Sequence, residues 1–289
     1  MQEGAGKVAS DVAKDAVVEA KQWVRWLARF GYAAKGVVYV VVGWLAFSAA
    51  LGVGGETTDT EGALRSIFRQ PAGPFLLTVV GLGLLAYSAW RLAQSLLDVE
   101  GKGTGARGLV KRTGYLFSGL AYAGLGWTAI TYAIGISTGA GRSQEDWTAI
   151  VLAHPFGSWA VFAAGLLLCG LALNAAIVAF GRLFRRKLRE RQIRRPLRAP
   201  VELLAMVGLL ARGTVFGLLG AFFIQAAINF DPSRAGGLSD VLVAIAGAPQ
   251  GPFLLGLMAL GLMAYGLFAM VQARYRKIPR PDSPAAGSG

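Results

Sequence analysis

The feature that most constrains the fold is a pair of apolar stretches that is repeated three times along the 289 residues. Each copy opens on a glycine (Gly36, Gly119 and Gly213) and places a proline before its second stretch (Pro71, Pro155 and Pro249). From the first copy to the second these anchors shift by 83 and 84 residues, and from the second to the third both shift by 94. Such regular spacing indicates an internal repeat.

The apolar stretches are long and almost free of charge. At ~1.5 Å per residue, each could cross a hydrocarbon layer of ~30 Å as a helix. With 54% apolar and 16% charged residues, the composition also lies outside that of ordinary soluble domains. The sequence therefore predicts an all-α integral membrane protein with six transmembrane helices, built as three tandem helical hairpins in a pseudo-threefold arrangement. The windows are 32–52, 74–96, 115–136, 157–180, 203–228 and 252–273.

The net charge of +13 is distributed unevenly between the connections. If the N-terminus lies inside the cell, 25 of the 29 Lys and Arg residues fall on the inner side. The outer loops carry the other four, together with seven acidic residues. Positive residues favour the cytoplasmic side of a membrane protein. We therefore expect a cytoplasmic membrane protein with both termini in the cytoplasm, and the charge gives no reason to expect nucleic acid as a partner.

Composition divides the chain further. In residues 1–24, apolar positions recur at three- and four-residue steps between charges, which predicts an amphipathic helix on the inner leaflet. Between the two stretches of each copy we expect a short helix at the outer face, with the proline in the first turn of the second long helix. The predicted segments are the N-terminal amphipathic segment 1–24, repeats 25–98, 108–180 and 201–277, a basic cytoplasmic loop 181–200 and a disordered tail 278–289.

Polar residues at one equivalent position of the three copies are the candidate intramembrane site. Lys35, Ser118 and Arg212 each precede the first glycine of their copy. Charged residues at membrane depth are costly and often functional, so these positions could form an anion-attracting ring. The alternative, which the position of Lys35 near the inner end of its window favours, is that the long side chains snorkel to head groups. Arg91, beside Trp90, is interpreted as a snorkelling residue.

The basic loop is a second candidate site. Residues 181–200 hold nine Lys and Arg residues against a single acid. Such a run could bind anionic lipid head groups, each basic residue contributing ~1 kcal/mol near the surface. The simpler interpretation, which we favour, is that the loop only enforces orientation. The candidate lipid-contacting residues are Arg185, Arg186, Lys187, Arg189, Arg191, Arg194 and Arg195.

Residues of the kind that catalyse reactions or bind metals are scarce. The chain has one histidine, His154, and one cysteine, Cys169, and neither belongs to a recognisable ligand pattern. Acid–base and nucleophilic catalysis need converging titratable groups, which the sequence does not supply. We therefore expect neither an enzyme nor a metal or other cofactor.

Three matching segments carry a resemblance to a known family. They read RFGYAAKGVVY at 29–39, RTGYLFSGLAY at 112–122 and MVGLLARGTVF at 206–216. The third departs from the other two by losing the leading arginine and both tyrosines. In these segments the chain resembles the bacterial membrane family DUF1206, over about residues 25 to 277. The resemblance implies a multi-pass membrane protein with three two-helix repeats, and it implies no particular activity.

Two functions remain open at this point. The first is a non-enzymatic structural, lipid-contacting or partner-binding role in the membrane, with the lipid bilayer and anionic head groups as the expected partners. The second is a passive channel or small-solute permease for anions, with its pathway near Lys35, Ser118 and Arg212. A structure separates them, because a permease needs these side chains to face the interior of the protein.

Overall fold

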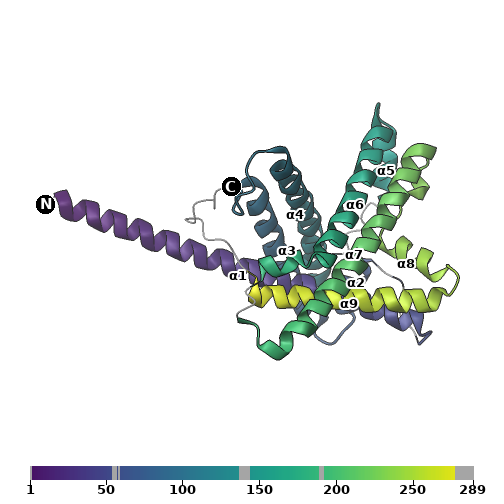
Figure 1. The fold of residues 1–289 in the computed structure, drawn as a ribbon, viewed down its shortest axis with the longest axis horizontal. Helices are drawn as coiled ribbons and strands as arrows, with labels where there is room; N and C mark the ends of the chain where they lie inside the picture. Colours follow the sequence, from purple (N-terminus) through teal and green to yellow (C-terminus); the bar gives the residue numbers. More distant parts are fainter. Residues whose placement is uncertain (1, 54–56, 58, 137–143, 189–191, 277–289) are drawn as a thin grey trace.

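The chain folds into helices that follow the three sequence repeats (Figure 1). The computed structural model describes residues 2–53, 57, 59–136, 144–188 and 192–276. Each repeat has a long helix, a short helix and a second long helix. The first repeat contains α1 (Gln2–Ala50), α2 (Thr60–Phe68) and α3 (Gly73–Leu96). The second contains α4 (Ala106–Ala133), α5 (Gln144–Leu152) and α6 (Gly157–Phe180), and the third α7 (Arg195–Asn229), α8 (Leu238–Ala246) and α9 (Gly251–Tyr275). The all-helical prediction is confirmed.

The N-terminal segment is not separate from the first repeat. Helix α1 runs through 49 residues without a break, so the predicted boundary at residue 24 does not coincide with a helix end. Its first half projects away from the other helices (Figure 1). The side chains that would decide its amphipathic character, in residues 1–25, lie outside the described part of the structure. The expected helix is therefore present, as an extension of the first long helix.

The same turn starts the second long helix of every repeat. The residue before the first helical glycine has a left-handed backbone, with φ of 58° at Ala72, 64° at Phe156 and 62° at Gln250. A Cβ atom added to the glycine that follows would lie 1.8 to 2.0 Å from a carbonyl oxygen of the preceding short helix. This close approach is the physical reason for the repeated Pro-x-Gly motif. The prediction that its proline occupies the first helical turn is wrong, because the helix begins at the glycine.

The most extensive helix packing crosses the boundaries between repeats. Helix α3 packs along α4, α6 along α7, and α9 along α1, so that the third repeat closes back on the first (Figure 1). One contact recurs in all three pairs. A Cβ atom added to a glycine in the first long helix of a repeat would meet a backbone oxygen of the helix from the neighbouring repeat. The distances are 2.7 Å from Gly43 to Ala259, 3.0 Å from Gly126 to Gly81 and 2.8 Å from Gly220 to Gly165. Small residues allow this close approach between apolar helices.

Packing within a repeat is less uniform. In the first repeat, α1 crosses α3 where Gly31 lies against the backbone of Tyr87. In the third, α7 crosses α9 at the equivalent pair, Gly208 and Tyr265. In the second, Gly114 has no such neighbour within 4 Å, and the described parts of α4 and α6 do not pack along each other. The predicted hairpin is therefore a packed unit in the first and third repeats only.

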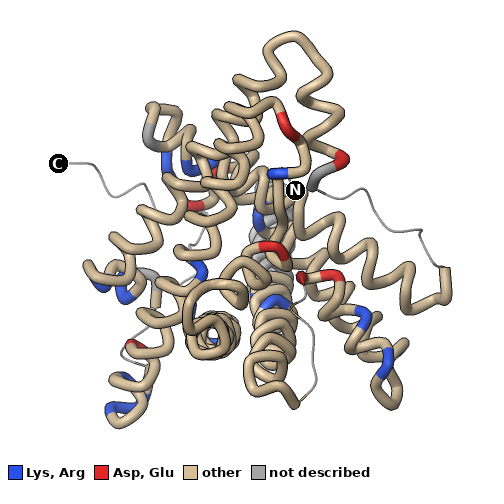
Figure 2. The backbone as a smooth tube through the Cα atoms, turned by 90° about the vertical axis from the view of Figure 1, so that its right-hand side faces the viewer, with Lys and Arg blue, Asp and Glu red and all other residues tan. Residues whose placement is uncertain are grey.

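Within the described residues, five helical segments are long and apolar enough to cross a membrane. They are Trp26–Ala50 and helices α3, α6, α7 and α9. Among the described residues α4 is the long helix that falls short, although no charged residue follows Arg112 within it. Tyrosine, tryptophan, threonine and glycine lower its hydropathy. Figure 2 shows that most of the tube is tan, with Lys, Arg, Asp and Glu as short scattered segments. These features are those of a membrane-embedded protein.

Candidate functional site

The predicted residue Lys35 lies inside the protein. Its side chain is 2% exposed, and its ammonium group donates hydrogen bonds to two tyrosine hydroxyls. The Nζ to Oη distances are 2.8 Å to Tyr265 and 3.2 Å to Tyr87. These acceptors come from α9 and α3, the two helices that pack against α1. The snorkelling interpretation of Lys35 is therefore wrong, because its ammonium group is held by hydroxyls of the interior.

Four tyrosine rings surround this ammonium group. Its Nζ lies between 4.9 and 5.8 Å from the ring centroids of Tyr39, Tyr87, Tyr122 and Tyr265, which we call the tyrosine cage. A cation within about 6 Å of a ring face is attracted by the ring quadrupole. Edge-to-face contacts between Tyr39 and Tyr265, and between Tyr87 and Tyr122, hold the rings together. The cage joins α1, α3, α4 and α9.

Arg212 reaches the same cage from α7. Its guanidinium carbon lies 4.5 Å from the ring centroid of Phe216 and 5.1 Å from that of Tyr265. Because Lys35 Nζ lies 5.0 Å from the centroid of Tyr265, the two cationic groups are at most about 10 Å apart. Arg212 Nε is buried and has no hydrogen-bond partner among the described residues. Two of the three predicted positions are thus brought together.

Ser118, the third predicted position, is partly exposed on α4. It lies one turn before Tyr122 of the cage, on the same face of the helix. Its neighbour Gly119 accepts a hydrogen bond from Ser88 Oγ at 2.7 Å, which ties α4 to α3. The second repeat therefore contributes a tyrosine to the centre, where the first and third contribute cations.

A chain of hydrogen bonds leads from the cage to the loop after α3. Tyr87 Oη accepts a second bond from Arg91 Nε at 2.8 Å, and Arg91 Nη1 donates to Gln94 Oε1 at 3.1 Å. The Gln94 amide then donates to a Glu100 carboxylate oxygen at 2.6 Å. Arg91 also lies over the ring of Tyr115, with its guanidinium carbon 5.1 Å from the centroid. The snorkelling interpretation of Arg91 is therefore also wrong, since its guanidinium bonds inward.

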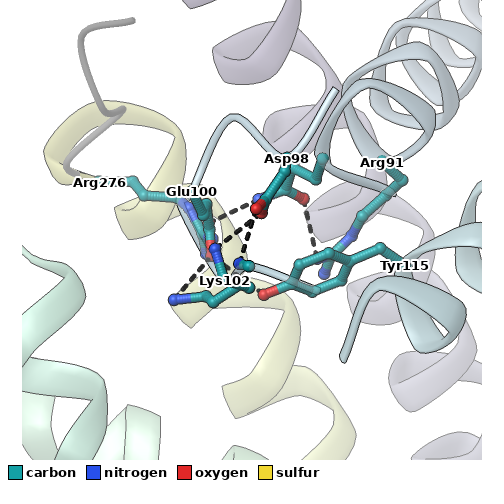
Figure 3. Close-up of polar contacts among 8 residues, drawn as sticks. Arg91, Asp98, Glu100, Lys102, Tyr115 and Arg276 are labelled. Carbon is teal, nitrogen blue, oxygen red and sulfur yellow. Dashed lines mark hydrogen bonds and ion pairs between the residues drawn. The ribbon is translucent and has the colours of Figure 1, made fainter. Parts of the chain in front are cut away.

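Glu100 ends this chain with a cluster of donors (Figure 3). Arg276 Nη2 donates to its Oε1 at 3.0 Å, and Tyr115 Oη donates to its Oε2 at 3.0 Å. Lys102 Nζ lies 3.6 Å from the same Oε2. The side chain of Glu100 is 8% exposed and that of Arg276 is 7% exposed, so this ion pair is buried. Burial makes such a pair sensitive to the loss of either partner.

We call the connected set the polar chain. Leaving out the loop residue Lys102, it carries four cations and one carboxylate, so with neutral tyrosines its net charge is +3. No described carboxylate forms an ion pair with Lys35 or Arg212. Uncompensated ions inside a protein cost several kcal/mol each, and a bound anion removes that cost. Its members are Arg212, Tyr265, Lys35, Tyr87, Arg91, Gln94, Glu100 and Arg276.

Metal-ligating side chains do not gather in the part of the chain that the structure describes. Among the described residues no group of three His, Cys, Asp or Glu side chains could hold a metal ion. His154 Nδ1 lies 2.8 Å from the Ile150 carbonyl oxygen, within its own short segment. Cys169 packs against Gly220 at the contact between α6 and α7. Neither residue reaches the tyrosine cage.

The basic loop is only partly described. A short 3₁₀ helix, η1 (Leu183–Lys187), follows α6, and Leu188 forms an isolated bridge with Arg276. Arg185 forms an ion pair with Glu202 of α7, and Arg186, Arg194 and Arg195 are exposed. Of the other predicted lipid-contacting residues, Arg189 and Arg191 lie outside the described residues, as does the side chain of Lys187.

The tyrosines of the cage were not among the predicted site residues. A sequence signal for them exists, because Tyr87 and Tyr265 each follow the repeat proline by 16 residues, in windows that are otherwise apolar. Tyr39 and Tyr122 likewise follow the candidate position by four residues. Hydroxyls at equivalent places of different copies predict a shared polar centre once the repeats are aligned. Glu100 gave no comparable signal.

The fold and the site define a class of protein, namely an all-helical protein of the membrane-embedded type with a repeated two-helix unit. The chain belongs to the family described as Domain of Unknown Function (DUF1206), whose model matches residues 30–98, 113–182 and 207–276. The expected family is therefore confirmed. The chain is also 33% identical over 258 residues to the uncharacterized protein YxxB of Bacillus subtilis (strain 168), covering 89% of this chain and 93% of that protein. No solved structure matches.

Proposed function

We propose that the protein crosses the cytoplasmic membrane six times, with both termini in the cytoplasm and the three repeats around a pseudo-threefold axis. The recurring glycine contacts between repeats support the axis, and the predominance of Lys and Arg in the inner connections supports the orientation. Phe75, Trp159 and Phe253 begin the second long helices and are 67 to 71% exposed. Aromatic side chains at equivalent helix starts are typical of a membrane interface.

Within that architecture, the proposed function is non-enzymatic binding and passive permeation of a small anion. One observation carries it: Lys35 is buried beside Arg212 without a described carboxylate to neutralise either group. A buried cation held only by hydroxyls and rings is poorly compensated. An anion at this level would meet the ammonium group, the unpaired Nε of Arg212 and the hydroxyl proton of Tyr265, whose oxygen already accepts from Lys35.

The other function, a structural or lipid-contacting role, is supported by the exposed arginines of the basic loop. Arg194 and Arg195 stand at the start of α7, where an anionic head group could bind. In that case the tyrosine cage would only stabilise the packing of the four helices that it joins. The two functions differ in what Lys35 does, because a structural ammonium group has no effect on the passage of ions.

Flux through reconstituted vesicles tests this. Purified protein is reconstituted into liposomes, and the liposomes are loaded with chloride. Chloride efflux is followed with a chloride electrode for the wild type, Lys35→Met and Arg212→Met. Removing either cation should lower chloride efflux by about tenfold or more, the equivalent of at least ~1.4 kcal/mol of lost stabilisation. Lys35→Arg, which keeps the charge, should retain more efflux than Lys35→Met. Arg234→Met is the matched control, because Arg234 is exposed and pairs with Asp231 away from the cage.

Two results would refute the permease. Equal efflux from the wild type and both Met variants would show that the cations do not line a pathway. Efflux from the wild type no greater than from empty liposomes would leave the structural role. Each variant is first checked for a single symmetric peak in gel filtration, so that a folding defect is not mistaken for lost flux.

A further inference from the structure

The donors around Glu100 form a site in their own right. Besides Lys102 of the loop, three donors stand on or directly after different helices: Gln94 on α3, Tyr115 on α4 and Arg276 directly after α9. Each donates to a carboxylate oxygen over 2.6 to 3.0 Å, as Figure 3 shows for Tyr115 and Arg276. Charge-assisted hydrogen bonds of this kind are among the strongest that side chains form. The helices thus present a converging cationic set of donors at one end of the polar chain.

The occupant of this site comes from a loop. Glu100 lies between α3 and α4, in a connection with left-handed backbone at Asp98 (φ 45°), Gly101 (φ 61°) and Gly103 (φ 72°). The Asp98 carboxylate accepts hydrogen bonds from the backbone N–H groups of Lys102 and Gly103, both at 2.7 Å, and so closes the loop. Gln94, Tyr115 and Arg276 therefore stand on packed helices or directly after one, while Glu100 and Lys102 stand on a short connection. Moving the loop would empty the site and leave the first three donors in place.

The site is also continuous with the cage. Gln94 and Arg91 connect it to Tyr87, whose hydroxyl accepts from Lys35. Of the charged groups in the polar chain, Glu100 is the one that carries negative charge. An anion that travels from the cage along these donors would arrive where the carboxylate sits. The anion and the Glu100 carboxylate cannot both occupy this group of donors at the same time.

We propose that Arg276, Gln94 and Tyr115 form the inner anion-binding position of the pathway, and that Glu100 is its built-in occupant, which a permeating anion must displace. The ligand class is a small singly charged anion no larger than a carboxylate group, such as chloride or nitrate. This inference rests on the proposed permease, since it assigns the inner end of the same pathway. A tethered carboxylate competes at a high effective concentration, so the site stays closed until Glu100 leaves.

Replacing the occupant by its neutral isostere tests this. Glu100→Gln keeps the shape and removes the charge that competes with a mobile anion. In detergent, nitrate or chloride should raise the melting temperature of Glu100→Gln by about 5 °C at saturation, because a ligand that binds only the folded state stabilises it. The wild type should shift far less. In liposomes, Glu100→Gln should release chloride about tenfold faster than the wild type.

The matched control is Glu202→Gln. Glu202, on α7, is also a carboxylate that pairs with an arginine, Arg185, but it does not belong to the polar chain. Its replacement should change neither the anion-dependent melting temperature nor the efflux. The double variant Glu100→Gln with Arg276→Gln should lose the anion-dependent shift, because the main donor is gone. If Glu100→Gln does not fold, Glu100→Asp, which withdraws the carboxylate by one methylene, should show the same gains to a smaller extent.

The outcomes separate this inference from the proposed permease. If Glu100→Gln matches the wild type in melting and efflux, while Lys35→Met still lowers efflux, the inner position is wrong and the permease stands. If no variant releases chloride, but nitrate still stabilises Glu100→Gln and not the double variant, the binding position stands and the permease is wrong. A Glu202→Gln variant that behaves as Glu100→Gln would show a general charge effect and overturn the assignment.

Discussion

Removing one hydroxyl from the tyrosine cage probes the buried ammonium group directly. In Tyr265→Phe the ring remains, so packing against Tyr39 is kept and only the 2.8 Å hydrogen bond from Lys35 is lost. Tyr87 Oη, at 3.2 Å, is then the remaining described oxygen acceptor. The substitution therefore separates hydrogen bonding from packing.

The expected cost depends on the charge of the donor. Neutral hydrogen bonds between helices in membranes average ~0.6 kcal/mol. Bonds to charged groups contribute ~1.5–3 kcal/mol, and a buried donor that loses its partner adds a desolvation penalty. We therefore expect Tyr265→Phe to lower the free energy of unfolding by about 2 kcal/mol. Tyr265→Phe with Tyr87→Phe should cost more than the two single changes together, because the ammonium group then has no described oxygen partner.

Unfolding in mixed detergent micelles, followed by tryptophan fluorescence, measures these differences. Tyr132→Phe is the control, because Tyr132 also accepts a bond from a cation, Arg65, but in an exposed place and at 3.3 Å. Its loss should cost no more than ~0.5 kcal/mol. If Tyr265→Phe costs no more than Tyr132→Phe, the reasoning that the buried Lys35 ammonium group depends on the Tyr265 hydroxyl is refuted.

Three further predictions concern packing, the loop and topology. Gly208→Ala should destabilise by about 1–3 kcal/mol, since a Cβ there meets α9 backbone at 2.5 Å, whereas Gly114→Ala should be neutral or stabilising in the same unfolding assay. Backbone N–H donors, first that of Lys102, lower the pKa of Asp98 below its ordinary value of 3.8. The stabilisation of the loop by the Asp98 carboxylate is therefore complete above pH 3.8 and is lost as the pH falls through the lower pKa of the folded state. Amide exchange should therefore rise in acid, and Asp98→Asn should remove that pH dependence. In a Cys169→Ser background, Asp146→Cys should react with an impermeant maleimide from outside intact cells and Arg186→Cys should not; the reverse pattern would contradict the orientation.

Much of the local structure could be predicted from the sequence. The repeat spacing and the apolar windows predicted the long helices, because helix formation and burial in lipid depend on nearby residues and their average polarity. The repeat proline predicted that a second helix follows, but the structure showed that this helix starts two residues later, at the glycine, and why. The glycine is required by a carbonyl oxygen of the short helix before it, at 2.0 Å from a Cβ at Gly73.

The candidate site was predicted in part. Lys35 and Arg212 were found because charge is conspicuous in an apolar window, but their surroundings were not. Whether a lysine near the inner end of an apolar window snorkels or turns inward depends on the groups that the neighbouring helices place around it. Here they offer the hydroxyls of Tyr87 and Tyr265, the second of which is 230 residues away in the chain.

The sequence alone therefore determined the repeat, the helices, their apolar character and the excess of positive charge, since these are properties of composition and short-range order. Tertiary structure decided which helices pack together, and the most extensive packing joins helices of different repeats, such as α9 and α1. It also brought Glu100 to Arg276 over 176 residues. Such contacts depend on how the shapes and charges of distant segments fit together, and a local sequence pattern does not predict that fit.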